Sequence, residues 1–92
     1  MIGVIRHKEL AALYAKGDAK SVQQKQGKRL IQILNLLATA YDIKDMRLPG
    51  LKLHKLTGDL KDFYAVSVSA NWRIIFRFAD GVAEDVDLVD YH

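Results

Sequence analysis

Apolar residues recur every three or four positions through the first half of the chain. Between residues 6 and 17, Leu10, Leu13 and Tyr14 follow this spacing, which predicts a helix. Gly17 suits the left-handed conformation in which many helices end. From residue 21 to about residue 41 a longer helix is predicted, with an apolar stripe formed by Leu30, Ile33, Leu34, Leu37 and Tyr41. Two helices are therefore expected before Pro49, the single proline.

Two further apolar residues, Ile31 and Leu36, lie off the stripe of the second helix. We favour the interpretation that they pack against the first helix. The alternative is that they form a surface for a partner.

The apolar period changes to two after residue 50. Residues 64–68 ("YAVSV") and 72–78 ("WRIIFRF") are rich in aromatic and β-branched residues, which is typical of strands, and residues 51–56 alternate less regularly. Asp80-Gly81 indicates a tight hairpin, so the strands that it joins must be antiparallel. A short strand at residues 2–5 is expected at an edge. The predicted fold class is α+β, with two N-terminal helices packed on one face of a curled, mainly antiparallel sheet of four to five strands.

Alternation assigns the strand residues to two faces. The core face should consist of Trp72, Ile74, Phe76 and Phe78. The other face should be open to water and carry Arg73, Ile75 and Arg77, joined by Ser67 and Ser69. In the last strand, one face should consist of Val82, Val86, Leu88, Asp90 and His92. Tyr91 falls on the opposite face, so a joint role for the last three residues requires the strand to twist or to end near Leu88.

Length and composition fit one small domain over residues 1–92, since 92 residues with 50% hydrophobic content support a single core. No apolar run reaches the roughly 20 residues needed to cross a bilayer, and the apolar run at residues 1–5 is too short for a signal-peptide core. We therefore expect a cytoplasmic protein with no membrane partner. The absence of cysteine excludes disulfides and thiol chemistry.

Charge is distributed unevenly along the chain. Residues 1–61 carry 12 Lys/Arg against 5 Asp/Glu, whereas residues 62–92 carry 2 against 6. A basic front half suggests a polyanionic partner for part of the surface. The alternative is that the lysines simply solvate the helices.

The absence of known sequence motifs excludes several kinds of site. The three histidines are too widely spaced for a zinc motif, and no phosphate-binding loop or serine-hydrolase motif occurs, so we expect no metal and no cofactor. RNA cleavage through its own 2′-hydroxyl needs only proton transfer and cations at the phosphate. The candidates for the proton steps are His54, His92, Asp90 and Tyr91, and the candidates for holding the phosphate are Arg73 and Lys55. Each of these residues, taken alone, also has an ordinary structural role.

The segments "LHKLTGD", "NWRIIFRF" and the terminal "VDYH", with "IRHKEL" and "KRL" earlier in the chain, resemble the HigB-type toxins of the RelE/ParE superfamily over essentially the whole chain. The resemblance implies a RelE-like fold and a toxin of a type II toxin–antitoxin system. Such toxins are metal-independent endoribonucleases that cleave mRNA in the ribosomal A site. The implied partners are the 70S ribosome with its mRNA and a HigA-type helix-turn-helix antitoxin, with which the toxin would form a hetero-oligomer such as a heterotetramer.

The resemblance also implies which residues act. The active-site positions would be His54, Arg73, Asp90, Tyr91 and His92, on the sheet face away from the helices. The residues that would meet RNA or the ribosome are Lys8, Lys16, Lys20, Lys25, Lys28 and Arg29, and the open-face Arg77 joins them. Thr57 replaces a lysine that several relatives carry. Because residues 55 and 57 of a regular strand point the same way, Lys55 is expected to substitute for it; otherwise cleavage is slower or depends more on Arg73.

Two other functions fit the same fold. One is a ParE-like toxin that inhibits DNA gyrase without cleaving nucleic acid, against which the terminal tyrosine and histidine argue. The other is a catalytically impaired module that only binds its antitoxin, through changes such as Thr57. Ends of mRNA mapped after induced expression would separate the three functions.

Overall fold

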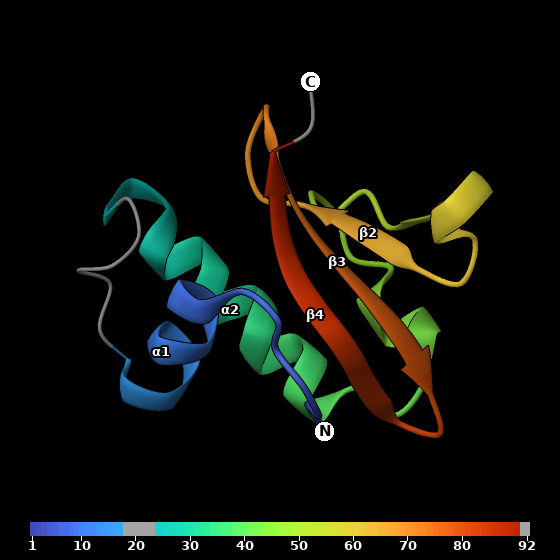
Figure 1. The fold of residues 1–92 in the computed structure, drawn as a ribbon, viewed down its shortest axis with the longest axis horizontal. Coiled ribbons are helices and arrows are strands. Elements are labelled where there is room, and N and C mark those ends of the chain that lie inside the picture. Colours follow the sequence, from blue (N-terminus) through green and yellow to red (C-terminus); the bar gives the residue numbers. More distant parts are fainter. Residues whose placement is uncertain (18–23, 91–92) are drawn as a thin grey trace.

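The structure, a computed structural model, describes residues 1–17 and 24–90, with residues 24 and 25 described by their backbone only. Two helices, α1 (Lys8–Lys16) and α2 (Gln24–Thr39), lie on one side of a four-stranded antiparallel sheet (Figure 1). The strands are β1 (His54–Lys55), β2 (Tyr64–Ser67), β3 (Trp72–Ala79) and β4 (Val82–Asp90), in that spatial order. Short 3-10 helices, η2 (Ile43–Met46) and η3 (Gly58–Leu60), lie in the connections. The predicted α+β architecture is confirmed.

Helix α1 ends as its sequence predicts. Gly17 adopts φ 66° and ψ 19°, and its N–H donates to the carbonyl of Leu13. Leu10 and Leu13 are fully buried. The predicted end of the first helix and its apolar face are therefore confirmed, although Tyr14 is exposed.

Helix α2 buries most of the predicted stripe, since the fully buried residues include Leu30, Ile33, Leu34 and Leu37. The extension of the stripe to Tyr41 was wrong. The helix ends at Thr39, and Asp42 and Asp45 then form a capping box that begins η2, leaving Tyr41 89% exposed. The predicted start at residue 21 lies outside the described residues.

The two residues that lie off the stripe, Ile31 and Leu36, are half-buried against the core. That core includes Leu10 and Leu13 of α1. That Ile31 and Leu36 pack against α1 in particular stays a prediction, and Leu36 also lines a cavity on the surface of α2.

The connections between strands follow local turn chemistry. Asp80 and Gly81 both have positive φ, 54° and 76°, as a two-residue hairpin of type I′ requires, and Ala79 pairs with Val82 across it. The first residues lie beside β4 through two isolated parallel bridges, Ile2 with Ala83 and Ile5 with Val86. The expected edge position of residues 2–5 is confirmed, in the form of bridges.

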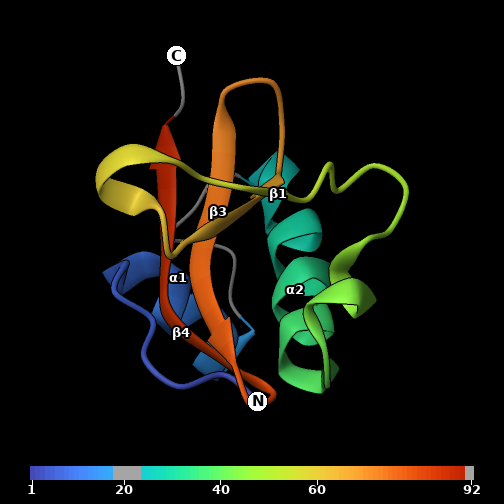
Figure 2. The ribbon, with the colours of Figure 1, turned by 90° about the vertical axis from the view of Figure 1, so that its right-hand side faces the viewer.

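Both faces of the sheet are covered, one by the helices and the other by the connection that contains η3 (Figure 1 and Figure 2). On the helix side, Ile74 and Phe76 are fully buried. On the other side, Ile75 is 8% exposed and Ala65 2%. Figure 2 views the sheet from the side away from the helices, and the connection that contains η3 lies in front of β3 and β4. The expectation of a face open to water was therefore wrong for its centre, because the chain after β1 folds back over it.

A β-bulge in β4 changes the predicted alternation. Ile75 pairs with Asp87 but Arg77 pairs with Glu84, so β4 contains one extra residue at this point, where Asp85 has φ 51°. As a result Ala83 and Val86 are both fully buried, and Val82 is only half-buried. The prediction that Val82 shares a face with Val86 was wrong, since period two does not continue through a bulge.

Candidate active site

Arg73 lies near the end of the sheet that holds the last described residue of β4. It pairs with Ser67 on one side and with Val89 on the other, on the face away from the helices. Its Nη1 donates to the carbonyl oxygens of Ser69 at 2.6 Å and Trp72 at 3.0 Å. These backbone contacts hold the half-buried guanidinium in one orientation, which is what recognition of a phosphate by a planar donor requires.

A small cavity of about 270 Å³, the Arg73 pocket, lies beside this side chain. Its walls come from η3 and the residues before it and from the sheet, and consist of Leu56, Thr57, Leu60, Ala65, Arg73, Ile75 and Val89. Sequence reasoning missed its apolar wall. The available signal was the pair of leucines flanking Gly58, whose φ of 69° turns the chain there.

His54 lies on β1 with an exposed side chain and pairs with Ala65. Its Nδ1 is 3.0 Å from the carbonyl oxygen of Lys52, which can only accept, so Nδ1 carries the proton in this hydrogen bond. In the neutral ring Nε2 is then the acceptor that a general base needs. His54 and Arg73 share the face away from the helices, with α-carbons about 12 Å apart by the spacing of strands and residues.

Lys55 is placed differently from its expected position. It pairs with Tyr64, and its Nζ lies 5.9 Å from the centroid of the Tyr64 ring. Strand β1 ends at Lys55, so Thr57 is not part of a regular strand, and the two side chains line different cavities. The expectation that residues 55 and 57 point the same way was wrong.

Asp90 ends β4 and pairs with Trp72, whereas Val89 pairs with Arg73. Alternation therefore places Asp90 on the opposite face of β4 from Val89, next to the end of β3 that carries Arg73. Tyr91 and His92 lie outside the described residues. The structure thus places His54 and Arg73 on the face away from the helices, whereas alternation places Asp90 on the opposite face, at the end of the sheet that carries Arg73. The expectation that Asp90 shares their face is not met.

Three of the lysines expected to meet RNA or the ribosome, Lys8, Lys16 and Lys28, have exposed side chains on the two helices. Lys20 lies outside the described residues, and the side chain of Lys25 is not described. These three lysines are therefore accessible to a partner.

The two arginines expected to meet RNA both make internal contacts. Arg29 donates to the carbonyls of Gly50 at 2.9 Å and Ser67 at 3.4 Å, and so joins α2 to the chain before β1 and to β2. Arg77 donates from Nε to Asp85 at 2.7 Å, while half of its side chain stays exposed. Both side chains are thus held in place by the fold.

The bulge residue Asp85 also pairs with Arg6, whose Nε lies 3.2 Å from Oδ1. Partial burial acts to raise the pKa of the Asp85 carboxyl. The hydrogen bond from Arg77 and the charges of Arg6 and Arg77 outweigh it, so the pKa lies below its ordinary value. The carboxylate therefore stays ionised between its two arginines well into the acid range.

Two kinds of feature are absent from the described residues. Among residues 1–17 and 24–90, no three His, Asp or Glu side chains gather closely enough to hold a metal ion. In the same part of the chain, no helix has both the length and the apolar character to span a bilayer.

Solved structures share this fold. YafQ from E. coli strain BL21(DE3) and a mutant of E. coli YafQ superpose with TM-scores of 0.60 and 0.61 at 19% identity, over 95% of this chain and 91% of theirs. At this identity the likeness shows the fold alone. Residues 4–92 also match a family of RelE-like toxins of type II toxin–antitoxin systems, which defines the class of protein.

Within that class the matching family is HigB, and this chain belongs to it. Endoribonuclease HigB from Proteus vulgaris is 36% identical over 92 residues, the full length of both chains. Toxin HigB-1 from Vibrio cholerae serotype O1 is 36% identical over 55 residues, which cover 59% of this chain and 58% of that protein. As a toxin of a type II system, the protein has a cognate antitoxin.

Proposed function

We propose that this HigB toxin is a ribosome-dependent endoribonuclease that cleaves mRNA in the ribosomal A site through the RNA 2′-hydroxyl, without a metal ion. The observation that carries the proposal is the full-length match, at 36% identity, to a protein named as an endoribonuclease. The toxin would act in the cytoplasm, where its substrate is translated.

The reaction is an internal transesterification. The 2′-oxygen attacks the adjacent phosphorus while a base takes its proton, and the bond from phosphorus to the 5′-oxygen breaks as that oxygen gains a proton. The products are a 2′,3′-cyclic phosphate and a 5′-hydroxyl. Negative charge develops on the phosphate in between, where a fixed cation stabilises it most.

The residues proposed for these steps lie at one end of the sheet or follow it in sequence. Arg73 holds the phosphate, because its guanidinium is oriented by carbonyls of the β2–β3 connection. The proton steps fall to His54, Asp90, Tyr91 and His92. For His54, the Nδ1 contact to Lys52 supports the tautomer that could accept the 2′-proton at Nε2.

Dependence on the ribosome follows from size. A 92-residue protein has little surface for holding a flexible RNA in line for attack. A substrate fixed in the decoding site supplies that orientation, which can be worth several kcal/mol of the barrier. The accessible Lys8, Lys16 and Lys28 are the proposed contacts to ribosomal RNA. For the antitoxin we propose a HigA-type helix-turn-helix protein that forms a hetero-oligomer with the toxin.

The test is cleavage of a defined mRNA on purified 70S ribosomes. The wild type should give a cyclic phosphate end on the ribosome and far less cutting of the same RNA alone. A 2′-deoxy nucleotide at the cut site should abolish the reaction. Arg73→Ala should lower kcat about 100- to 1,000-fold, the range for loss of one transition-state donor. Deletion of residues 91 and 92 should abolish cleavage and leave antitoxin binding intact.

The matched control is Lys44→Ala, an exposed cation on η2 that lines none of the described cavities and should cleave like the wild type. Equal cutting of free and ribosome-bound RNA would remove the ribosome requirement. Cleavage of the 2′-deoxy substrate would contradict the mechanism.

A further inference from the structure

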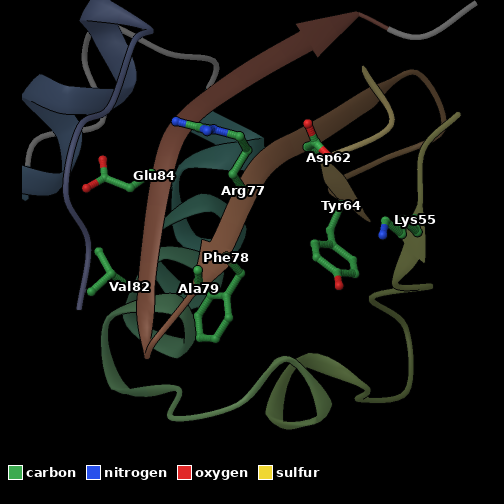
Figure 3. A pocket seen from close by; sticks show the side chains of 8 residues that line it. All are labelled: Lys55, Asp62, Tyr64, Arg77, Phe78, Ala79, Val82 and Glu84. Carbon is green, nitrogen blue, oxygen red and sulfur yellow. The ribbon is translucent and has the colours of Figure 1, made fainter. Parts of the chain in front are cut away.

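A second cavity, the Tyr64 pocket, lies towards the other end of β3 from Arg73 (Figure 3). Its volume is about 350 Å³, within the range of small-molecule sites. The side chains that characterise it are two aromatic rings and four charged groups: Tyr64, Phe78, Lys55, Asp62, Arg77 and Glu84. Neither the family description nor the relatives' names assign a role to this cavity.

The cavity exists because β2 is shorter than β3. Strand β2 begins at Tyr64, which pairs with Phe76, so the last three residues of β3 have no β2 residue beside them. In Figure 3 the Tyr64 ring lies between Lys55 on β1 and Phe78 on β3. The edge of the sheet is thus hollowed where two aromatic rings reach the surface.

The Tyr64 ring is held rigidly. It stacks on Phe76 with centroids 6.1 Å apart and an interplanar angle of 27°, and Phe76 in turn meets Phe78 edge to face at 6.5 Å. Phe76 is fully buried, so the stack is anchored in the core. The half-buried ring is flanked by Phe76 on β3 and by the exposed Lys55 on β1, so a nucleobase would stack on the Lys55 side of the ring when that side chain turns to a phosphate.

Two charged groups beside the ring are available to bind a ligand. Within residues 1–17 and 24–90, no hydrogen bond or ion pair engages the Lys55 ammonium, which lies over the Tyr64 ring, or the Asp62 carboxylate. Arg77 is held by Asp85. A phosphate entering the cavity would therefore be attracted to Lys55 and repelled by Asp62. These two charges would orient a bound nucleotide with its phosphate towards Lys55.

One wall of the cavity lies on the same face of the sheet as Arg73. Arg77, on this wall, lies on the same strand and the same face as Arg73. Arg77 follows Arg73 by four positions, which is a distance of about 13 Å along the strand. That is the span of a few nucleotides of one RNA strand. Tyr64, which pairs with Phe76, and Lys55, which pairs with Tyr64, belong to the helix-side face, so an RNA strand would reach them around the edge of the sheet where β2 begins.

We propose that the Tyr64 pocket binds one nucleotide of the mRNA substrate, a few positions from the cleaved bond, with its base stacked on Tyr64 and its phosphate at Lys55. The inference rests on the proposed function and adds a specificity site to it. Lys55 is then a binding residue rather than a substitute for a catalytic lysine at position 57.

The first experiment measures binding of the full-length toxin to 70S ribosomes programmed with mRNA that carries a 2′-deoxy nucleotide at the cut site. Tyr64→Leu should weaken binding about 5- to 100-fold, as loss of one stacked base does, while Tyr64→Phe should bind normally. Lys55→Ala should weaken binding and reduce the slope of log K against log salt by about 0.7, the value for one phosphate contact on a single strand. Lys44→Ala is the matched lysine control.

The second experiment replaces the bases around the cut site one at a time with abasic nucleotides. One position outside the cleaved dinucleotide should weaken binding by the wild type and have no further effect on Tyr64→Leu. If no such position exists, the pocket does not bind mRNA. A loss of ribosome affinity in the variants would then come from contacts to ribosomal RNA.

Kinetics separate binding from catalysis. On a cleavable mRNA, Lys55→Ala should raise KM and keep kcat at saturating ribosome concentration. A fall in kcat with KM unchanged would overturn the inference and give Lys55 a catalytic role. Wild-type cleavage of the same mRNA reports on the proposed function independently, so the two ideas can fail separately.

Discussion

A single residue, Asp85, shows how a local irregularity in a strand creates an interaction network. The bulge gives Asp85 a positive φ and turns its side chain, only 17% exposed, between two arginines from distant parts of the chain. Arg6 belongs to the first segment and Arg77 to β3. The same carboxylate thus fastens the N-terminal segment to the sheet and holds one wall of the Tyr64 pocket.

Asp85→Asn should lower the free energy of unfolding at neutral pH and remove part of its acid dependence. Because the folded-state pKa of Asp85 is depressed, its contribution is complete above its ordinary value of 3.8 and is lost as pH falls from there through the folded-state pKa. Urea unfolding between pH 7 and pH 3 should show the two proteins converging at the acid end. Asparagine tolerates positive φ as well as aspartate does, so the substitution should leave the backbone strain at position 85 unchanged.

The control for that comparison is Asp59→Asn, at an exposed residue of η3 outside this network. It should leave the pH profile parallel to that of the wild type. A constant difference between Asp85→Asn and the wild type at every pH would show that the ion pairs do not contribute.

At the scale of elements, α1 depends on its ends and on its burial. A helix of nine residues is too short to be stable in isolation. Its first turn is capped by His7, whose Nδ1 accepts from the N–H of Leu10 at 3.1 Å, and its last turn by Gly17. Leu10 and Leu13 then attach it to the core.

Gly17→Ala should destabilise the protein by about 1 kcal/mol, the cost of a left-handed conformation for a residue with a β-carbon. The effect would be conformational, because within the described part of the chain no heavy atom beyond the adjacent residues lies within 4 Å of the position that the β-carbon would take. Gly17→Asn should cost less, since asparagine is the next most common residue there. Denaturant midpoints with unchanged m-values would measure both, and equal stability of the alanine variant would contradict the strain.

At the scale of the whole molecule, the chemical groups are divided between two sides. Lys8, Lys16 and Lys28 are exposed on the two helices, while Arg73, His54 and the two pockets belong to the sheet and its connections, where Lys52, Lys55 and Lys61 are also exposed. Cations on both sides suit the proposed cleavage of an mRNA strand that is held on a large RNA assembly.

Replacing Lys8, Lys16 and Lys28 together with glutamine should weaken binding to 70S ribosomes and reduce the salt slope by roughly 2 to 3, since each phosphate contact contributes about 0.7 to 0.9. The value of kcat at saturation should be unchanged, because these residues are outside the proposed active site. Binding at several salt concentrations measures the effect, and an unchanged slope would exclude these lysines from the ribosome contact.

The proposed site was only partly accessible from the sequence. Alternation placed Arg73 on the face away from the helices, and the register confirms it. It also predicted that the side chains of Lys55 and Thr57 point the same way. This prediction failed because β1 has only two residues, so its alternation does not continue to residue 57. The leucines of the Arg73 pocket were not expected, because their role depends on η3 folding back over Ile75.

The sequence by itself determined the elements and their turns, because these depend on neighbours within a few residues: the 3.6 period of the helices, the left-handed Gly17, and the Asp80-Gly81 hairpin. Only the tertiary structure decided which segments meet. The bulge at Asp85, the covering of the sheet by η3 and the separation of Lys55 from the Arg73 pocket all arise from packing between distant segments, whose register no local pattern specifies.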